Sequence, residues 1–381
     1  MELERLLNLE KLLEKKSFFL FGPRATGKST LIRRQLAGSA QVIDLLDSRV
    51  YLALSARPYE LEQMIGARKK DLVVIDEIQR IPELLNEVHR LIENEGLTFL
   101  LTGSSARKLR RGQANLLAGR VWQARLFPLC SREIPGFDLE RYLRFGGLPA
   151  VYLSDYPAEE LDAYVNTYLK EEIMAEGLVR RLPPFSRFLN TIAMASGEML
   201  NITSLGSDCQ VAPSTVREYL ALLEDTLVGF TLPAWTESKK RKAIRTAKFY
   251  LFDPGVTHVL AGTESLDRNS NLYGKAFEQF LAMELRSWLS YRRKRSALSY
   301  WRSTAGHEVD FIIGSEVGIE VKSSRAIGPA DYRGLVALRE EGIVPRLYLV
   351  SQDPRARESD GIRALHWADF LDELWGERLL R

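Results

Sequence analysis

Residues that build disulfide frameworks and zinc sites are scarce in this sequence. Its 381 residues include two cysteines and four histidines, and no Cys-x-x-Cys pair occurs. That scarcity argues against a disulfide scaffold or a zinc site and fits a reducing compartment. No apolar run approaches the roughly 18–20 residues that span a bilayer, and the charged start MELERLLNLEKLLEKKSF is not typical of a secretion signal. We therefore predict a cytoplasmic protein with no membrane partner.

A large excess of charge of one sign is also missing. Lysine and arginine number 53 against 50 for aspartate and glutamate, which gives a formal net charge of +3. Any affinity for nucleic acid must therefore come from local basic patches. Apolar residues make up 45% of the chain, which at this length is enough for two or three domains that each bury a core.

A phosphate-binding motif stands near the start of the chain, in FLFGPRATGKSTLIRRQL. Residues 17–21 predict a buried strand, residues 22–29 match G-x-x-x-x-G-K-[ST], and residues 29–36 predict a helix, which is the context of a P-loop. The glycines let main-chain N–H groups cradle phosphate oxygens at the start of the helix. We expect Lys28 to reach the β- and γ-phosphates and Ser29 to ligate Mg²⁺. The predicted ATP-binding residues are Gly22, Pro23, Arg24, Ala25, Thr26, Gly27, Lys28, Ser29 and Thr30.

An acidic pair follows a second apolar strand. In KKDLVVIDEIQR, residues 72–75 predict a buried strand that leads into Asp76 and Glu77, the Walker B arrangement. Asp76 can hold Mg²⁺, directly or through water, and Glu77 can polarise the attacking water as a general base. The alternative is a buried strand that ends in a solvated acidic turn. Together with the P-loop, the pair predicts ATP and Mg²⁺ as cofactors and ATP hydrolysis as the reaction.

Two further positions are candidates for completing the nucleotide site. The strand LTFLLTGSSARKL ends where a sensor residue would touch the γ-phosphate or the water, and we favour Ser104 over its neighbour Ser105. An ordinary strand-end turn explains the same residues. In ANLLAGRVWQ, Arg120 is either an arginine finger, acting within its subunit or on a neighbour, or a solvated surface residue. The predicted catalytic residues are Lys28, Glu77, Ser104 and Arg120.

The order of apolar strands and helical patterns predicts an α/β fold. From residue 17 to about residue 130, it suits a parallel sheet covered by helices, with ligands bound at the carboxyl ends of the strands. We assign residues 1–135 to this P-loop core. The stretch FGGLPAVY then interrupts the pattern, and a long helix is expected from 158 to 176. We assign residues 136–185 to a helical lid or connector.

A helix-turn-helix pattern occupies the next segment, NITSLGSDCQVAPSTVREYLALLEDTLVGF. Helices are expected at 202–208 and 213–223, and a hairpin is expected from strands at 228–232 and 247–252. We therefore predict a winged-helix domain over residues 186–260. The exposed face of its second helix is poor in positive charge for a helix that reads DNA.

Basic residues gather in the expected wing, ESKKRKAIRTAK, and such a run suits phosphate contacts without base reading. The alternatives are a solvated hairpin tip and a plain packing module. A second basic run, YRRKRSALSYWR, carries the interleaved aromatics Tyr291, Tyr300 and Trp301, which favour nucleic acid. The predicted DNA contacts are Arg217, Lys239, Lys240, Arg241, Lys242, Arg292, Arg293 and Arg295, and the two runs also contain Arg245, Lys248, Lys294 and Arg302.

A metal-type constellation marks residues 261–381, the predicted third domain. The helix NLYGKAFEQFLAMELRSWL carries Glu278, and short strands carry Asp310, Glu320 and Lys322. Glu320 and Lys322 share one strand face, so the two carboxylates could bind a second Mg²⁺ or Mn²⁺ and Lys322 could activate water. This is the D-x(n)-E-x-K pattern of restriction-endonuclease-like nucleases. The alternative is a surface hairpin with an E-x-K salt bridge, and the pattern leaves cleavage itself open.

Five stretches together resemble a known family: GPRATGKST, VVIDEIQR, LLTGSSARKL with LAGR, FGGLPAVY, and GKAFEQFLAMEL with YWRSTAGHEVDFII and GIEVKSS. The chain is similar to prokaryotic AAA-type ATPases with a C-terminal restriction-endonuclease-like domain of unknown function. The resemblance implies an AAA core, a winged-helix module, a nuclease-like module and a homo-oligomer with shared sites. It implies that Gln79 acts beside the Walker B acids and that Arg120 senses nucleotide or acts in trans. No second sensor arginine is assigned in the lid.

Three functions fit these observations. In the first, ATP hydrolysis drives action on DNA by remodelling, translocation, branch migration or cleavage. In the second, the protein is a nucleotide-dependent switch for a protein partner, and its nuclease-like module is inactive. In the third, the protein is a structural assembly that holds nucleotide. The two basic segments favour the first function, which predicts that DNA stimulates ATP hydrolysis.

Overall fold

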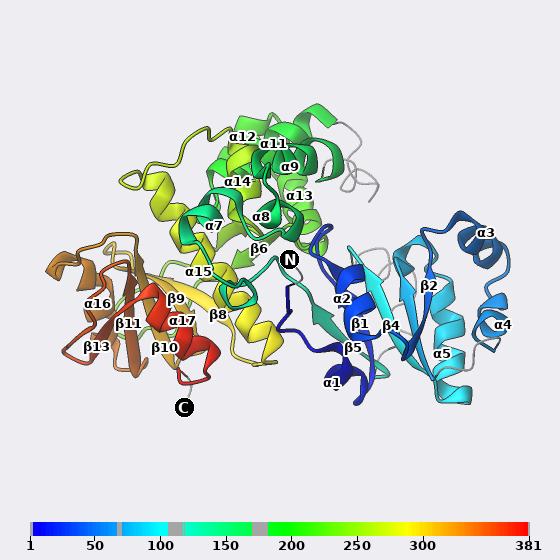
Figure 1. Ribbon diagram of the computed structural model, residues 1–381. Helices are drawn as coiled ribbons and strands as arrows, with labels where there is room; N and C mark the ends of the chain where they lie inside the picture. Colours follow the sequence, from blue (N-terminus) through cyan, green and yellow to red (C-terminus); the bar gives the residue numbers. More distant parts are fainter. Residues whose placement is uncertain (1–2, 67–70, 106–116, 118, 170–181, 380–381) are drawn as a thin grey trace.

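The computed structural model describes residues 3–66, 71–105, 117, 119–169 and 182–379. Two sheets lie on opposite sides of the molecule, and a group of helices lies above the space between them (Figure 1). Among the described helices, none combines the length and the apolar character that a bilayer crossing requires.

Five parallel strands form the N-terminal sheet, in the order β2-β3-β4-β1-β5. β1, β3 and β4 are apolar runs with both faces buried, as expected of a parallel sheet covered by helices. Because β4 lies between β1 and β3, the loops that follow these strands meet at one edge of the sheet. The predicted parallel sheet is confirmed. The strands are β1 (Ser17–Phe21), β2 (Ala40–Asp44), β3 (Leu72–Asp76), β4 (Thr98–Gly103) and β5 (Val121–Arg125).

Helices cover both faces of this sheet. Successive side chains of β1 point to opposite faces, so Phe18 and Leu20 pack with α1 and α2, whereas Phe19 and Phe21 pack with α3, α4 and α5. The two apolar layers fix the sheet rigidly beneath the loops at its carboxyl edge. The helices are α1 (Leu9–Leu13), α2 (Lys28–Gln35), α3 (Ser48–Ala56), α4 (Glu60–Gly66) and α5 (Leu84–Glu95).

Short helices connect this unit to the rest of the chain. They are α7 (Leu139–Phe145), α8 (Pro149–Leu153) and α9 (Pro157–Ala163). The helix predicted for 158–176 is present in its described part, as α9 to Ala163 and then as a π-helical turn over Tyr164–Leu169. The remainder of that range lies outside the described residues.

Four helices and a strand pair form the middle of the molecule. Asn201 caps α12 by accepting the Ser204 N–H, and Pro213 occupies the first turn of α13, so both predicted helices begin where their sequence signals stand. The paired strands expected after them are also present. The elements are α11 (Leu182–Met194), α12 (Ile202–Cys209), α13 (Pro213–Asp225), antiparallel β6 (Gly229–Leu232) and β7 (Lys248–Leu251), and α14 (Pro254–Ala261).

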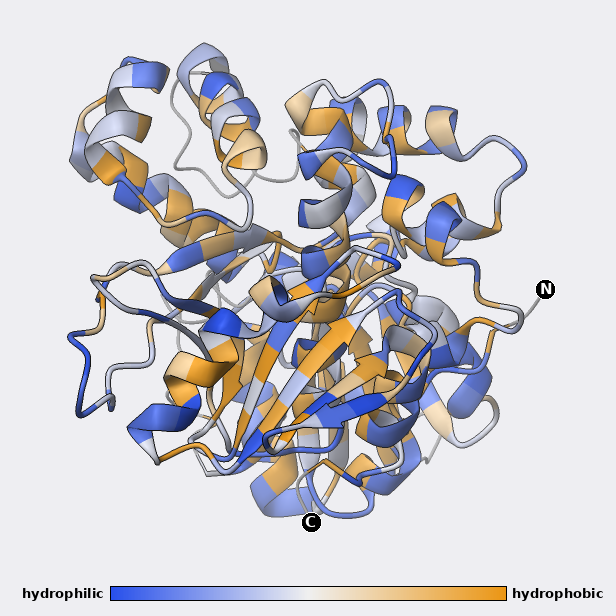
Figure 2. Cartoon of the chain, turned by 90° about the vertical axis from the view of Figure 1, so that its left-hand side faces the viewer, coloured by the Kyte–Doolittle hydropathy of each residue, from blue (hydrophilic) through white to orange (hydrophobic). Residues whose placement is uncertain are grey.

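Six strands form the C-terminal sheet, in the order β12-β13-β11-β10-β9-β8. α15 and α17 cover one face and α16 covers the other, and Figure 2 shows apolar residues concentrated in the strands between them. The sequence prediction missed β12, β13 and α17. The elements are α15 (Asn271–Tyr291), β8 (Leu298–Arg302), β9 (Glu308–Ile313), β10 (Val317–Lys322), α16 (Arg333–Glu341), β11 (Arg346–Ser351), β12 (Arg357–Ser359), β13 (Ile362–His366) and α17 (Trp367–Trp375).

α15 joins the parts of the molecule. Its buried Glu284 accepts the main-chain N–H of Ser131 at 2.6 Å and the indole N–H of Trp375 at 2.7 Å. Burial raises the pKa of this carboxyl to about 7. One side chain therefore attaches both the segment that leaves the N-terminal sheet and the last helix to α15.

Candidate functional site

The phosphate loop lies between β1 and α2 and has the backbone that its motif predicts. Gly27 has φ +89°, a conformation that glycine adopts without strain, and a Cβ on Gly22 would lie 2.5 Å from the carbonyl oxygen of Leu126. The buried Lys28 ammonium donates to the carbonyl oxygens of Gly22 at 2.7 Å and Pro23 at 3.2 Å. The lysine thus points back across its own loop.

Three polar side chains meet where β1, β3 and β4 end. The Ser29 hydroxyl donates to Asp76 Oδ2 at 2.9 Å, and the Thr102 hydroxyl donates to Asp76 Oδ1. Mg²⁺ prefers oxygen ligands such as a hydroxyl and a carboxylate, and these two groups already lie side by side. The residues therefore fit the predicted Mg²⁺ site, with Thr102 orienting the carboxylate. The sequence analysis did not assign a role to Thr102.

Glu77 is held beside this group by residues from two strand ends. Its φ of +61° is unusual for a side chain other than glycine, and its N–H donates to the Thr102 hydroxyl at 3.1 Å. The Gln79 amide donates to the Glu77 carboxylate and, at 3.4 Å, to the hydroxyl of Ser104. The structure therefore brings Glu77, Gln79 and Ser104 together. Their roles as base, orienting residue and sensor stay predictions.

Arg120 lies far from these residues. It precedes β5, whose first residue pairs with Ser17 at the start of β1, so Arg120 lies at the amino-terminal edge of the sheet. There its guanidinium forms an ion pair with Glu93 at 2.6 Å. A role for Arg120 at the nucleotide of its own subunit does not fit this place, whereas a role toward a neighbouring subunit stays a prediction.

Two residues that sequence reasoning missed hold the phosphate loop from outside. The buried Arg5 donates to the carbonyl oxygens of Thr26 and Phe127, each at 2.7 Å, and forms an ion pair with Glu133 at 3.0 Å. The hydroxyl of Tyr164 donates to the carbonyl of Arg24 at 3.3 Å. No local motif signals either contact, because Arg5 stands 21 positions before Thr26 and 122 before Phe127, and Tyr164 stands 140 positions after Arg24.

The nuclease-type residues of the C-terminal domain do gather, around an additional lysine. Lys248 Nζ lies 2.7 Å from Glu308, 3.3 Å from Glu278 and 3.9 Å from Asp310. Glu320 pairs with Lys322 at the edge of this cluster. Burial and, second, the Glu278 charge raise the pKa of Asp310 to about 7.

The described residues give no support for the second metal that the sequence predicted, which stays a prediction. Among the described residues, no group of three or more His, Cys, Asp or Glu side chains is arranged to hold a metal ion. The ammonium of Lys248, buried and surrounded by carboxylates, supplies the positive charge instead. The sequence analysis placed Lys248 in an exposed wing, and that placement is wrong because β7 carries its side chain inward.

The expected wing is not a free hairpin tip. Its main chain lies along β8 and extends the C-terminal sheet, with the Trp235 N–H donating to the Tyr300 carbonyl at 2.6 Å and the Ile244 N–H donating to the Arg302 carbonyl at 2.8 Å. The N–H groups of Lys239 and Lys240 donate to Glu341 on α16. The wing therefore joins the middle of the molecule to its C-terminal domain.

The other predicted DNA contacts differ in accessibility. Tyr300 and Trp301 are fully buried, so the prediction that they stack on nucleic acid is wrong. Arg292 and Lys294 pair with Glu377, and Arg293 lies over the rings of Phe18 and Trp122. Arg241 pairs with Glu340 and Glu341. Among the basic side chains of α13 and the two basic runs, the exposed ones are Arg217, Lys239, Lys240, Lys242, Arg245, Arg292, Arg293 and Arg295.

Replacing Arg241 with alanine is expected to loosen the wing. The variant loses the hydrogen bond to the Ala337 carbonyl and the ion pairs with α16, so trypsin should cut after the neighbouring lysines sooner. Cleavage followed by mass spectrometry measures the change. Arg245→Ala, which removes an exposed arginine of the same segment, is the matched control. Equal cleavage rates in the two variants would contradict the docked wing.

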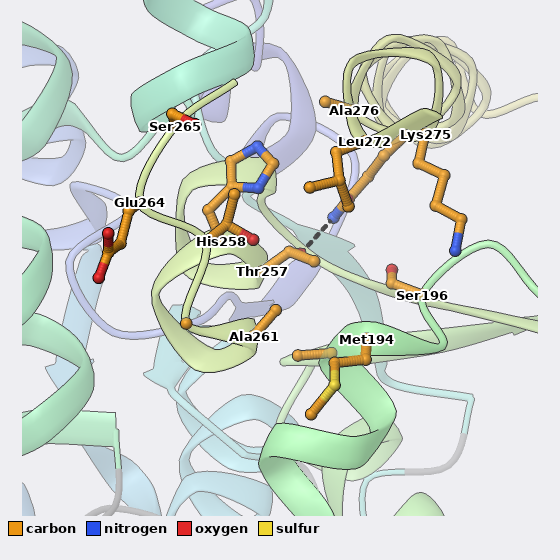
Figure 3. Close-up of a pocket in the computed structure, with 14 residues that line it drawn as sticks. Met194, Ser196, Thr257, His258, Ala261, Glu264, Ser265, Leu272, Lys275 and Ala276 are labelled. Atoms are coloured by element: carbon orange, nitrogen blue, oxygen red, sulfur yellow. Dashed lines mark hydrogen bonds between the residues drawn. The ribbon is translucent and has the colours of Figure 1, made fainter. Parts of the chain in front are cut away.

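A pocket of about 500 Å³ lies between α11, α14 and α15 and is lined by none of the predicted site residues (Figure 3). Several of its polar side chains are partnered within the protein. Gln279 donates to the Thr257 hydroxyl at 2.9 Å, His258 Nε2 lies 3.0 Å from the Leu143 carbonyl, and Lys275 pairs with Glu198. Because these groups already have partners, the pocket is a weaker candidate for a ligand site than the phosphate loop.

Comparison with known proteins agrees with the N-terminal part of this description. Residues 14–135 match the model of the AAA domain, whereas residues 136–267 and 273–370 match two domains of unknown function, DUF8612 and DUF4143. Uncharacterized proteins of Mycobacterium tuberculosis and Mycobacterium bovis are 29% identical over 314 residues, which cover 80% of this chain and 69% of each relative. An uncharacterized protein of Methanocaldococcus jannaschii is 22% identical over 338 residues, 80% of this chain and 74% of its own.

A solved structure of the replication initiator DnaA, bound to AMPPCP and single-stranded DNA, aligns with 56% of this chain and 85% of its own at 11% identity. Its TM-score of 0.28 is too low to establish a shared overall fold. The sheet, the phosphate loop and the matched family model nevertheless agree on one part of the chain. Residues 14–135 are an AAA-type P-loop domain.

Proposed function

We propose that this protein binds and hydrolyses ATP and uses the energy to act on DNA. The observation that carries the ATPase proposal is the convergence of Lys28, Ser29, Asp76 and Glu77 at the carboxyl edge of one parallel sheet. This edge is where α/β proteins bind nucleotides. A lysine, a hydroxyl and two carboxylates are the groups that phosphoryl transfer to water requires.

Each residue of this site has a separate role in the proposed hydrolysis. When ATP binds, the Lys28 ammonium leaves the carbonyl oxygens of Gly22 and Pro23 and donates to phosphate oxygens instead. Its positive charge then faces the phosphates. Ser29 and Asp76 would hold Mg²⁺, which would neutralise charge on the phosphates. Glu77 orients and polarises the attacking water, and Gln79 fixes the position of the Glu77 carboxylate.

DNA is the proposed target because exposed basic residues remain on the wing and on α13. Arg217 stands on the outer face of α13, and Lys240 and Lys242 stand on the wing. We propose that α11 to β7 form a winged-helix module whose docked wing presents lysines to phosphates. Phosphate contacts of this kind give affinity without base recognition.

A test of this function compares ATP hydrolysis with no DNA and with single-stranded, duplex and branched DNA. One of these forms should raise the rate. In Lys240→Gln/Lys242→Gln, the slope of log affinity against log salt should fall by about 2, because each lost phosphate contact removes about one unit. The matched control, Lys11→Gln/Lys15→Gln, removes two exposed lysines from α1 and its C-terminal end and should keep the slope. A hydrolysis rate indifferent to all DNA forms would overturn the proposal.

A nucleotide-dependent switch for a protein partner is the second candidate. The observation that favours it is the Lys248 ammonium inside the acidic cluster, where a nuclease would need a metal. In this alternative, the restriction-endonuclease-like domain is an inactive binding module. Slow ATP turnover without DNA retention at moderate salt would support it.

A further inference from the structure

Two main-chain carbonyls of the phosphate loop accept hydrogen bonds from residues of other segments. The Arg5 guanidinium donates to the Thr26 carbonyl at 2.7 Å, and the Tyr164 hydroxyl donates to the Arg24 carbonyl at 3.3 Å. Both donor side chains are buried, and the ion pair with Glu133 holds the guanidinium in place. The two contacts therefore fix the peptide unit that follows each of these carbonyls.

The contact made by Arg5 determines where the N–H of Gly27 points. A trans peptide is planar, so its N–H lies opposite its C=O. Because the Thr26 carbonyl turns toward Arg5, the N–H of Gly27 turns away from Arg5. This N–H donates to no acceptor in the part of the chain that the structure describes. It is therefore available at the start of α2, where a phosphate would bind.

Tyr164 has the same relation to the N–H of Ala25, and the backbone of Ala25 is strained. The Arg24 carbonyl turns toward Tyr164, so the N–H of Ala25 turns away, and it too has no acceptor among the described residues. Ala25 has φ +64°, a left-handed conformation that is costly for a residue with a side chain. Ala25 and Gly27, both left-handed, alternate with a residue that is not, and such alternation turns N–H groups toward one anion.

We propose that Arg5 and Tyr164 are positioning residues for the nucleotide. Each holds one peptide unit of the loop with its N–H toward the phosphates, and each acts through the loop without touching the nucleotide. The proposal rests on the proposed function, because it requires a nucleotide at this loop. Tyr164 packs beside Phe252, next to β7, with ring centroids 6.4 Å apart, and Arg5 also donates to the Tyr291 hydroxyl of α15 at 3.5 Å. Nucleotide affinity therefore depends on how these two segments are docked against the loop.

The test is a titration of the full chain with fluorescent ADP and Mg²⁺, which measures binding whether or not ATP is hydrolysed. Tyr164→Phe removes only the hydroxyl and should weaken binding about 2–10-fold, the range for one neutral hydrogen bond. Tyr156→Phe, which changes an exposed tyrosine just before α9, is the matched control and should bind like the wild type. Arg5→Met should weaken binding about 10–100-fold, because a charged donor is lost. If Arg5→Met does not fold, Arg5→Met/Glu133→Gln removes both charges of the buried pair and takes its place.

Ala25→Gly separates a positioning role from a merely structural one. Glycine adopts a positive φ without strain, so adding Ala25→Gly to Tyr164→Phe should recover most of the lost affinity, whereas a loss of general stability would not be recovered. Wild-type affinity in either Tyr164→Phe or the Arg5 variant, or a loss that Ala25→Gly does not reduce, would overturn the proposal alone. A wild-type protein that binds no ADP, or Lys28→Ala binding ADP as tightly as the wild type, would overturn the proposed nucleotide site and this proposal with it.

Discussion

Glu77→Gln is expected to bind ATP normally and to lose its hydrolysis, by a factor of about 10²–10⁴ if Glu77 is the general base. The amide keeps the shape of the side chain and its place beside Gln79 but cannot polarise water. Lys28→Ala, in contrast, should lose binding as well, because the ammonium that crosses the loop is gone. Fluorescent-nucleotide titration and phosphate release measure the two steps separately.

Glu83→Gln is the matched control for Glu77→Gln. Glu83 is an exposed carboxylate just before α5 and a few residues beyond Glu77, so its loss changes the net charge equally without touching the site. Both binding and turnover should stay at the wild-type level. If Glu77→Gln hydrolysed ATP as fast as this control, Glu77 would not be the base. If Lys28→Ala bound ATP as tightly as the wild type, the assigned loop would not be the nucleotide site.

Lys248→Met is expected to destabilise the protein by about 3–5 kcal/mol, the usual cost of removing one partner from a buried ionic group. The methionine fills the space of the lysine stem but leaves Glu278, Glu308 and Asp310 without the ammonium that they share. Urea unfolding measures the loss. Lys322→Met is the matched control, and its loss should be smaller because its ammonium is one-third exposed and has one carboxylate partner.

The cost of Lys248→Met should grow as pH rises from about 5.5 to 8. Asp310 in the folded protein has a pKa of about 7, above the value of about 3.9 expected in the unfolded chain. A carboxyl whose pKa is raised by folding favours the folded state at low pH and loses that contribution as pH rises through the folded-state pKa. Removing the lysine raises the folded-state pKa of Asp310 further. An equal loss of stability at both pH values would contradict Lys248 as the counter-charge.

Local sequence predicted where the side chains of the proposed nucleotide site lie, because short-range geometry sets their positions. A strand, a glycine loop and a helix within 20 residues fix where Lys28 and Ser29 stand, and the end of an apolar strand fixes Asp76. The long-range contacts had no such signal. Thr102 contacts Asp76 because β4 lies beside β3 in the sheet. Arg5 contacts Thr26 because the chain folds back toward the phosphate loop.

The basic runs misled the sequence analysis for a related reason. A run of charges predicts exposure, but Lys248 starts a strand that turns its side chain into the acidic cluster, and Arg241 binds α16. Tyr300 and Trp301 suggested stacking on bases, yet both faces of β8 are covered and the two rings fill opposite cores. Composition shows that charges and rings are present, and only the tertiary pairing decides which of them face solvent.

The contact made by Arg5 has a consequence for how this protein can be divided. The region that matches the AAA domain begins at residue 14, nine positions after Arg5. A fragment cut at that limit would discard the guanidinium that holds the Thr26 carbonyl and would leave the Glu133 carboxylate buried without its partner. The structural unit around the phosphate loop therefore extends beyond the matched region, to at least Arg5. Residues that precede α1 thus brace the loop from outside that region.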